Sequence, residues 1–229
     1  MAEPMRPRRH VVVFLRAPRL GRVKRRLARG IGAVAALAFY RATATRLVRI
    51  LARDPRWHCH LAVTPDRRAP LPPPWRRARV MAQGPGDLGR RMARAFRHLP
   101  PGPAVIVGSD IPDLAAGHVA AAFAALGRCD VALGPAEDGG YWLIGLARRR
   151  PVPHGIFVGV RWSSPRALAD TRASLPRRAR IAVLERLADI DDGEAYRRWL
   201  IRRRRDAPAS AASARRDCTG DGDCRAGGG

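Results

Sequence analysis

The sequence predicts an α/β fold in which a mostly parallel central sheet lies between two layers of helices. Short apolar runs alternate along the chain with segments whose apolar residues have helical spacing. Several of these runs, such as Val11 to Leu15, are continuous rather than alternating, as in strands that are buried on both faces. Repeated βα units of this kind form a three-layer α/β/α fold.

The individual elements follow from these patterns. Apolar runs predict strands at residues 11–15, 60–64, 79–82, 104–108, 130–134, 141–146 and 181–184. Helical spacing predicts helices at residues 33–53, 88–98, 115–126, 164–175 and 194–205. Asp87 is the expected cap of the second helix and Asp192 that of the last, because their side chains can accept from free amides at a helix start.

The length of 229 residues fits one domain. We predict a flexible N-terminus at residues 1–9, a single domain at 10–205 and a disordered Ala/Ser/Gly-rich tail at 206–229. The first ten residues do not resemble a signal peptide, and no apolar run is long enough to span a membrane. We therefore expect a cytoplasmic protein with no membrane partner.

The formal net charge of +25 is extreme, and 44 residues are Lys or Arg. The arginines are spread along the whole chain, which points to a coding bias, so we do not expect nucleic acid as a partner. The single lysine is Lys24. An ammonium is a compact point charge, unlike a guanidinium, so Lys24 is either a functional residue or a chance survivor of the bias.

The cysteines and histidines do not predict a metal centre. Cys59 and Cys129 lie in or beside apolar runs and are expected in the core. The flanking His58 and His60 would point to the opposite side of a strand from Cys59. Cys218 and Cys224 in the tail could form a disulfide or bind a metal.

Two glycine-containing turns are candidate anion sites. In the first, Arg16 to Arg26, Gly21 allows close approach of the backbone to a phosphate, and the basic side chains supply charge. In the second, Gly84 to Met92, amides at a helix start favour an anion. The alternatives are a solvated basic helix start and simple capping by Asp87.

Carboxylates follow two of the predicted strands. Asp110 comes directly after the strand at 104–108, where Ser109 and Pro112 stiffen the turn, and it is a candidate Mg²⁺ ligand. Asp113 is expected only to cap the next helix. The late run from Asp189 to Asp192 places further acids after the last strand, which in so basic a chain suggests a cation.

A fourth segment places Glu137 and Asp138 before two glycines and two aromatic residues. A hairpin would explain the Asp-Gly-Gly sequence alone. The adjacent acids and the aromatic strand that begins at Tyr141 suggest instead a surface on which a sugar or nucleobase could rest.

Three segments, Gly86 to Met92, Gly108 to Asp113 and Gly134 to Tyr141, resemble a known family in their order and spacing. It is the bacterial GT-A-type family labelled radical-SAM/selenodomain-associated transferase type 1. It is similar to the guanylyltransferase that activates 2-phospho-lactate, within the nucleotide-diphospho-sugar transferase superfamily. The chain departs from the family at Arg16 and Arg25, where lysine and threonine are usual.

The resemblance implies a GT-A-like fold and a set of site residues. Asp110 and Asp191 would hold Mg²⁺ or Mn²⁺. The nucleotide would bind at Arg16, Gly21, Lys24, Arg26, Gly86, Asp87, Gly89 and Ser109. The acceptor would lie at Glu137, Asp138, Gly139, Gly140 and Tyr141. Lys24 and Arg26 would take up charge that develops on the phosphates, and Asp138 would act as the base.

The expected function is therefore Mg²⁺-dependent transfer from a nucleoside triphosphate to a small phosphorylated or hydroxylated acceptor. One alternative is a glycosyltransferase that uses a nucleotide-sugar on the same fold. The other is a non-enzymatic basic protein that binds nucleic acid. The residues do not specify the nucleotide base, the acceptor or an oligomeric state.

Overall fold

The computed structural model describes residues 8–65, 71–72, 75 and 78–206. Its strands are β1 (His10–Arg16), β2 (His58–Thr64), β3 (Arg79–Ala82), β4 (Ala104–Gly108), β5 (Val131–Pro135), β6 (Tyr141–Leu146) and β7 (Ile181–Val183). Its helices are α1 (Arg25–Ile31), α2 (Ala33–Arg53), α3 (Leu88–His98), α4 (Ala116–Leu126), α5 (Ala167–Ala173) and α6 (Gly193–Asp206).

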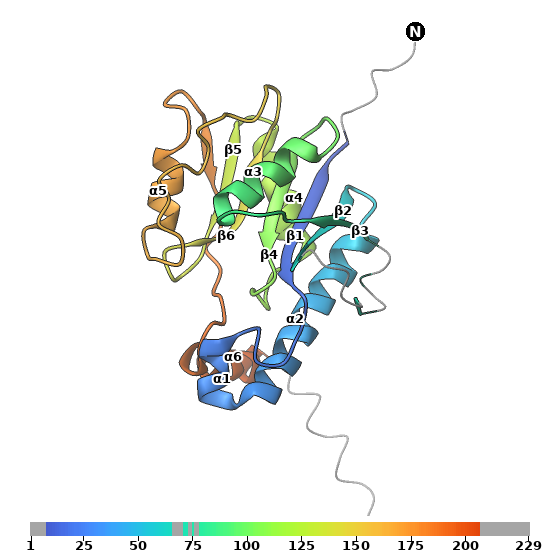
Figure 1. The fold of residues 1–229 in the computed structure, drawn as a ribbon, viewed down its shortest axis with the longest axis vertical. Coiled ribbons are helices and arrows are strands. Elements are labelled where there is room, and N and C mark those ends of the chain that lie inside the picture. The colour runs from blue at the N-terminus through green and yellow to red at the C-terminus, as the bar shows by residue number, and fades with distance from the viewer. Residues whose placement is uncertain (1–7, 66–70, 73–74, 76–77, 207–229) are drawn as a thin grey trace, which may run out of the picture.

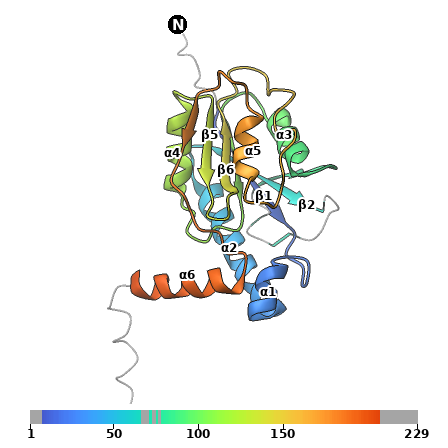
Figure 2. The same ribbon diagram turned by 90° about the vertical axis from the view of Figure 1, so that its left-hand side faces the viewer.

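The strands form one 7-stranded sheet in the order β3-β2-β1-β4-β6-β5-β7. Only β6 runs against its neighbours, β4 and β5, and the other pairs are parallel. Helices lie on both faces of the sheet (Figures 1 and 2). The predicted three-layer α/β/α fold with a mostly parallel sheet is confirmed.

Each face of the sheet has its own apolar core. Val11, Val13 and Leu15 of β1 pack in one core with residues of α2 and α4. Val12 packs in the other core, with residues of α3 and α5. Burial of both sets explains why this strand is a continuous apolar run.

A third, smaller cluster joins α1, α2 and α6 below the sheet (Figures 1 and 2). Leu27, Ile190 and Trp199 are buried there. The backbones of α1 and α6 approach closely. A Cβ added to Gly30 would lie only 2.9 Å from the Cα of Gly193. This packing fixes the loop before α6 beside the loop after β1.

All the predicted strands and helices are present, and the main differences concern α1, α5 and β2. The helix α1 was not predicted, because its only buried residue is Leu27 and so short a segment has no recognisable apolar stripe. The helix α5 is shorter than the predicted 164–175, and β2 begins at His58 rather than at residue 60. The predicted caps Asp87 and Asp192 accept from the amides of Arg90 and Ala195.

Asp113, by contrast, does not cap the next helix as expected. Ala115 is the N-cap residue of α4. The Asp113 carboxylate accepts instead from the indole nitrogen of Trp199 in α6, at 3.1 Å. Although Asp113 lies near the start of α4, its carboxylate therefore makes a tertiary contact with α6.

The predicted N-terminal segment and tail, including Cys218 and Cys224, lie almost wholly outside the described residues. Cys59 and Cys129 have free thiols, and burial raises the pKa of the Cys59 thiol to about 12. In the described part of the chain, no helix has both the length and the apolar character needed to cross a membrane.

Three histidines gather at the start of β1 and β2. The rings of His10 and His60 are nearly buried, and their nitrogens Nδ1 and Nε2 lie 3.3 Å apart. The ring centroid of His58 is 5.9 Å from that of His10. Within the described residues no group of three or more histidine, cysteine, aspartate or glutamate side chains is arranged to hold a metal.

We predict that this histidine cluster destabilises the protein in mild acid. Burial lowers the pKa of His10, and burial together with the nearby His10 and Arg79 lowers the pKa of His60 to about 4. The unfolded chain therefore binds more protons between pH 6.5 and 4, and stability falls as the pH falls through this window. We expect His60 to account for roughly 2 kcal/mol of loss by pH 4.5, measured by urea unfolding.

The matched variants are His60→Gln, which removes the ionisable ring, and His98→Gln on the exposed end of α3. His60→Gln should reduce the loss between pH 7 and 4.5, whereas His98→Gln should not. Equal losses in both variants and the wild type would contradict the prediction.

We predict that Gly134→Ala is strongly destabilising. A Cβ on Gly134 would lie 2.4 Å from the buried ring of Trp142 on the adjacent strand β6. The expected cost is about 1–3 kcal/mol or more, because the indole has little room to move. Gly117→Ala in α4 is the control, since its Cβ would meet nothing within 4 Å and helix propensity favours alanine. A Gly134→Ala protein as stable as Gly117→Ala in urea would show that the indole can shift.

Candidate active site

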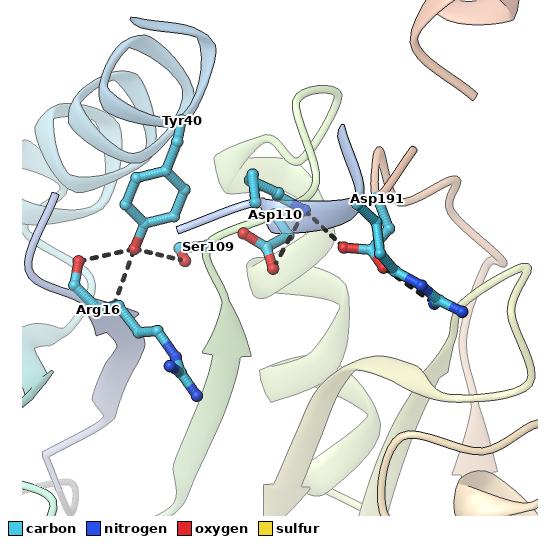
Figure 3. Close-up of polar contacts among 7 residues, drawn as sticks. Arg16, Tyr40, Ser109, Asp110 and Asp191 are labelled. Atoms are coloured by element: carbon cyan, nitrogen blue, oxygen red, sulfur yellow. Dashed lines mark hydrogen bonds and ion pairs between the residues drawn. The ribbon is translucent and has the colours of Figure 1, made fainter. Parts of the chain in front are cut away.

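Three charged side chains that are distant in the sequence meet at the carboxyl ends of β1 and β4. Lys24 lies in the loop after β1, Asp110 follows β4, and Asp191 lies just before α6. The Lys24 Nζ is 3.3 Å from Asp110 Oδ2 and 3.5 Å from Asp191 Oδ1. Figure 3 shows the Asp110 and Asp191 carboxylates directed toward the same point. In open α/β sheets this edge is where ligands bind.

The segment after β7 carries Asp191 across the edge of the sheet. The amides of Leu184 and Leu187 donate to the carbonyls of Leu133 and Pro135, so this segment continues alongside β5. The amide of Ile190 then lies 3.4 Å from the carbonyl oxygen of Asp110. This path, together with the buried Ile190, brings Asp191 beside Asp110.

Lys24 is held in an unusual conformation. It is the N-cap residue of α1 and has φ 49° and ψ 46°, in the left-handed region. For a residue other than glycine this costs about 1–2 kcal/mol. Its side chain is 4% exposed, and Nζ has no hydrogen-bond partner among the described residues. A strained, buried ammonium without hydrogen bonds is rare unless a site uses it.

Further carboxylates surround this ammonium. Asp189 lies two positions before Asp191. The pKa of Asp189 is raised to about 6, mainly by burial and also by the charges of Asp138 and Asp191, while the charge of Lys24 acts in the opposite direction. Asp189 therefore belongs to the same electrostatic cluster, although the sequence pattern did not single it out from its acidic neighbours.

Tyr40 of α2 forms hydrogen bonds with the backbone at the end of β1. Its hydroxyl accepts from the amide of Arg16 and donates to the Arg16 carbonyl, both at 2.8 Å, and Ser109 Oγ lies 3.5 Å away (Figure 3). Burial and, to a lesser degree, the nearby Asp110 charge together raise the pKa of Tyr40 to about 12. The apolar spacing of the predicted helix at residues 33–53 did not mark Tyr40 as a site residue, and the need of a buried phenol for polar partners was the available signal.

The remainder of the first turn faces solvent. Gly21 has φ +70°, and a Cβ there would meet nothing within 4 Å. Arg16 is exposed. The Arg26 side chain is 77% exposed, and its Nη1 lies 3.3 Å from Asp191 Oδ2. The loop is thus an open cationic strip beside the buried Lys24.

The second glycine turn lies at the same edge of the sheet but has mainly structural contacts. Asp87 accepts from the amide of Arg90 at 2.8 Å. Gly86 has φ +101°, and its carbonyl accepts from Arg91 Nε. A Cβ on Gly89 would lie 2.6 Å from Phe157 Cβ, so close packing explains the lack of a side chain there.

The acidic turn between β5 and β6 is a hairpin. Asp138 Oδ1 accepts from the amide of Gly140, and the Gly139 carbonyl accepts from the amide of Leu168. Gly139 has φ +83°, and a Cβ there would lie 2.3 Å from the Pro165 carbonyl oxygen. Glu137 and Asp138 are both exposed.

Of the two aromatic residues after this turn, Trp142 is buried and not available to a sugar or base. The Trp142 side chain is buried against Gly134, and its indole nitrogen donates to the Glu185 carbonyl at 3.0 Å. The Tyr141 hydroxyl lies 3.4 Å from Thr171 Oγ1 in α5, and its ring packs edge-on against Trp162. The expectation for Trp142 was wrong because Gly134 leaves a space that the indole fills.

The residues at the site fit a magnesium ion that is shared with a ligand. Carboxylate oxygens of Asp110 and Asp191 both lie within 3.5 Å of Lys24 Nζ, so a divalent ion held by the two acids would lie beside this ammonium. Mg²⁺ commonly takes one or two protein carboxylates and completes its shell with phosphate oxygens and water.

Known structures share the fold. A protein from Desulfovibrio desulfuricans G20 named "putative nucleotide-diphospho-sugar transferase" superposes with a TM-score of 0.69 and 28% identity, over 80% of this chain and 82% of that one. The Rv0371c homologue from Mycobacterium sp. strain JC1 superposes with a TM-score of 0.50 and 17% identity, over 88% and 99% of the two chains. No protein of curated function matches in sequence.

The region from β4 to the acidic hairpin lies within a recognised family pattern, although Lys24 and Asp191 fall outside it. The pattern spans residues 47–164 and describes an uncharacterised protein conserved in bacteria. Since it covers more than half of the chain, this protein belongs to the DUF2064 family.

Proposed function

We propose that this protein is a divalent-metal-dependent transferase that uses a nucleotide donor. Its preferred reaction is nucleotidyl transfer from a nucleoside triphosphate to a small phosphorylated or hydroxylated acceptor. The observation that carries the proposal is the buried Lys24 ammonium, which faces Asp110 and Asp191 without a hydrogen bond among the described residues.

A phosphate would satisfy this ammonium. Lysine can donate three hydrogen bonds, and Lys24 Nζ makes two ion pairs but no hydrogen bond among the described residues. A phosphate oxygen could accept from Nζ, while the exposed Arg16 and Arg26 bind the outer charge of a triphosphate. The open backbone at Gly21 leaves space for such a chain.

The two carboxylates would hold the metal. Asp110 and Asp191 would bind Mg²⁺ or Mn²⁺ together with oxygens of the donor phosphates. Such an ion, when bound, neutralises phosphate charge and fixes the donor for in-line attack. Lys24 and Arg26 would then stabilise the charge that develops on the leaving phosphates.

The acceptor would approach from the acidic hairpin. Asp138 is exposed, and its charge acts on Asp189 beside the proposed metal ligands. We assign Asp138 as the group that accepts the proton of the acceptor, with Glu137, Gly139, Gly140 and Tyr141 shaping that side of the site.

A second candidate is glycosyl transfer from a nucleotide-sugar. It is favoured by the similarity to the Desulfovibrio protein, a "putative nucleotide-diphospho-sugar transferase" that is 28% identical to this chain. The two reactions share the donor site and differ in the bond broken. The narrower resemblance to the radical-SAM/selenodomain-associated type 1 transferases is part of the same proposal.

We predict that Asp110→Asn removes the metal dependence of nucleotide binding. Wild type would be titrated calorimetrically with ATP, CTP, GTP and UTP, each with and without Mg²⁺. For the nucleotide that binds best, we compare the affinity measured with Mg²⁺ to the affinity measured without it. This ratio should be at least about tenfold lower in the variant than in the wild type, which corresponds to 1.4 kcal/mol. The ratio is measured because loss of a carboxylate beside Lys24 can itself strengthen metal-free binding.

Asp113→Asn is the matched control. Asp113 lies in the same loop, but its carboxylate accepts from Trp199 and pairs with Arg202. This variant should keep the wild-type ratio. An unchanged ratio in Asp110→Asn would contradict the metal site. Binding of DNA that weakens steeply with salt and ignores Asp110→Asn would favour a nucleic-acid-binding protein instead.

We predict that Lys24→Met lowers turnover by about 10²–10³-fold, because it removes a charge that stabilises the transition state. Lys24→Arg should also be impaired, since a planar guanidinium does not fit the place of a side chain that is 4% exposed. Arg19→Met, in the exposed part of the same turn, should remain active.

The products decide between the two reactions. Pyrophosphate released from a nucleoside triphosphate supports nucleotidyl transfer, and nucleoside diphosphate released from a nucleotide-sugar supports glycosyl transfer. A folded Lys24→Met variant with full turnover would overturn the assigned role of the lysine.

A further inference from the structure

A cavity lies at the opposite edge of the sheet from Lys24. It has a volume of about 560 Å³, which is within the range of sites for small organic ligands. The cavity opens where β5 begins and β6 ends, since Val131 and Leu146 line it and pair with one another. Leu146 also pairs with Ala104 at the start of β4, whereas Asp110 follows the end of β4.

The floor of this cavity is apolar. Val131, Leu146, Ile156 and Leu175 line it and are buried parts of the core on the α3 and α5 face. A hollow with such a floor can bury an apolar group and so gain hydrophobic free energy.

The rim is strongly cationic. Five arginines line the cavity with a single carboxylate, Asp130. Asp130 is already shared, because its oxygens lie 3.5 Å from Arg149 Nη1 and 3.7 Å from Arg180 Nε. In the part of the chain that the structure describes, Arg148, Arg150 and Arg178 have no carboxylate partner.

The backbone conformation and hydrogen bonds of Arg148 hold its positive charge in a fixed place. Arg148 has φ 53°, in the left-handed region. Its guanidinium is half-buried and donates to the carbonyls of Leu99, Pro100 and Gly102. Burial lowers the pKa of Arg148. The three carbonyls fix the direction of the guanidinium but do not neutralise it, so a fixed positive charge remains at the cavity.

We propose that this cavity binds a small organic phosphate, with the apolar part of the ligand on the floor and the phosphate dianion among Arg148, Arg150 and Arg178. A phosphate dianion is preferred to a carboxylate because several guanidinium groups lack a counter-charge, and because the oxygens of a tetrahedral phosphate can accept from more than one guanidinium. The site is separate from the proposed nucleotide site and does not depend on it.

The probe is 1-naphthyl phosphate, whose binding is followed by its own fluorescence. We expect saturable binding to the full chain that is at least about tenfold tighter than that of 1-naphthoate, 1-naphthol or inorganic phosphate. Equal binding of naphthoate or naphthol would overturn the phosphate assignment. Equal binding of inorganic phosphate would show that the apolar floor is not used, and would overturn the proposal as well.

Variants locate the probe. Arg150→Glu/Arg178→Glu should weaken binding at least about tenfold, whereas Arg197→Glu/Arg204→Glu on α6, with the same change of net charge, should not. All four side chains are exposed, so the folded state should persist, which thermal unfolding would verify. Equal weakening in both double variants would reveal binding to overall charge and overturn the proposal.

Lys24→Met separates this site from the nucleotide site. Unchanged affinity for naphthyl phosphate in that variant supports a second site, even if the proposed transferase activity fails its own test. Loss of affinity there would place the probe at Lys24 and overturn the inference.

Discussion

The candidate site depends on one buried ammonium that faces two carboxylates. Lys24, Asp110 and Asp191 come from three separate loops, and Lys24 Nζ lies 3.3 and 3.5 Å from the two acids. A charge removed from water is tolerated only where opposite charges compensate it, so each loop requires the other two. The close packing of Gly30 against Gly193 serves the same end, because it fixes α1, which follows Lys24, against α6, which follows Asp191. The strained backbone of Lys24 is stable only within this arrangement.

The fold was largely predictable because the sheet is buried on both faces. Strands such as β1 and β4 are continuous apolar runs, and α2 and α3 have a clear apolar stripe. The helix α1 lacks such a stripe and is stabilised by its contact with α6, which no local pattern records. The contact of Asp113 was not predicted for the same reason, because its partner Trp199 is distant in the sequence. Local patterns thus predicted the layers but not the contacts between helices at the end of the sheet.

The site was predictable only in part. Asp110 and Lys24 could be singled out, since one follows a buried strand and the other is the only lysine of the chain. Tyr40 was not, because its helical position is that of an ordinary core residue and only the fold brings its hydroxyl to Arg16. Trp142 was misassigned because the sequence does not show that Gly134, on the neighbouring strand, leaves room for its ring. Roles that depend on cross-strand or helix–strand contacts require the three-dimensional structure.

The charged residues at the two edges of the sheet support the two proposed sites for different reasons. In a chain with net charge +25, acids are scarce, so their convergence around Lys24 at the carboxyl edge is informative by itself. Arginines are abundant everywhere, so their number at the other edge says little. There the informative features are geometric, namely the apolar floor and the guanidinium of Arg148, which three carbonyls hold in a fixed direction. A solvated arginine selected by coding bias alone has no need of such support, and this support is the reason to propose a ligand at the amino edge of the sheet.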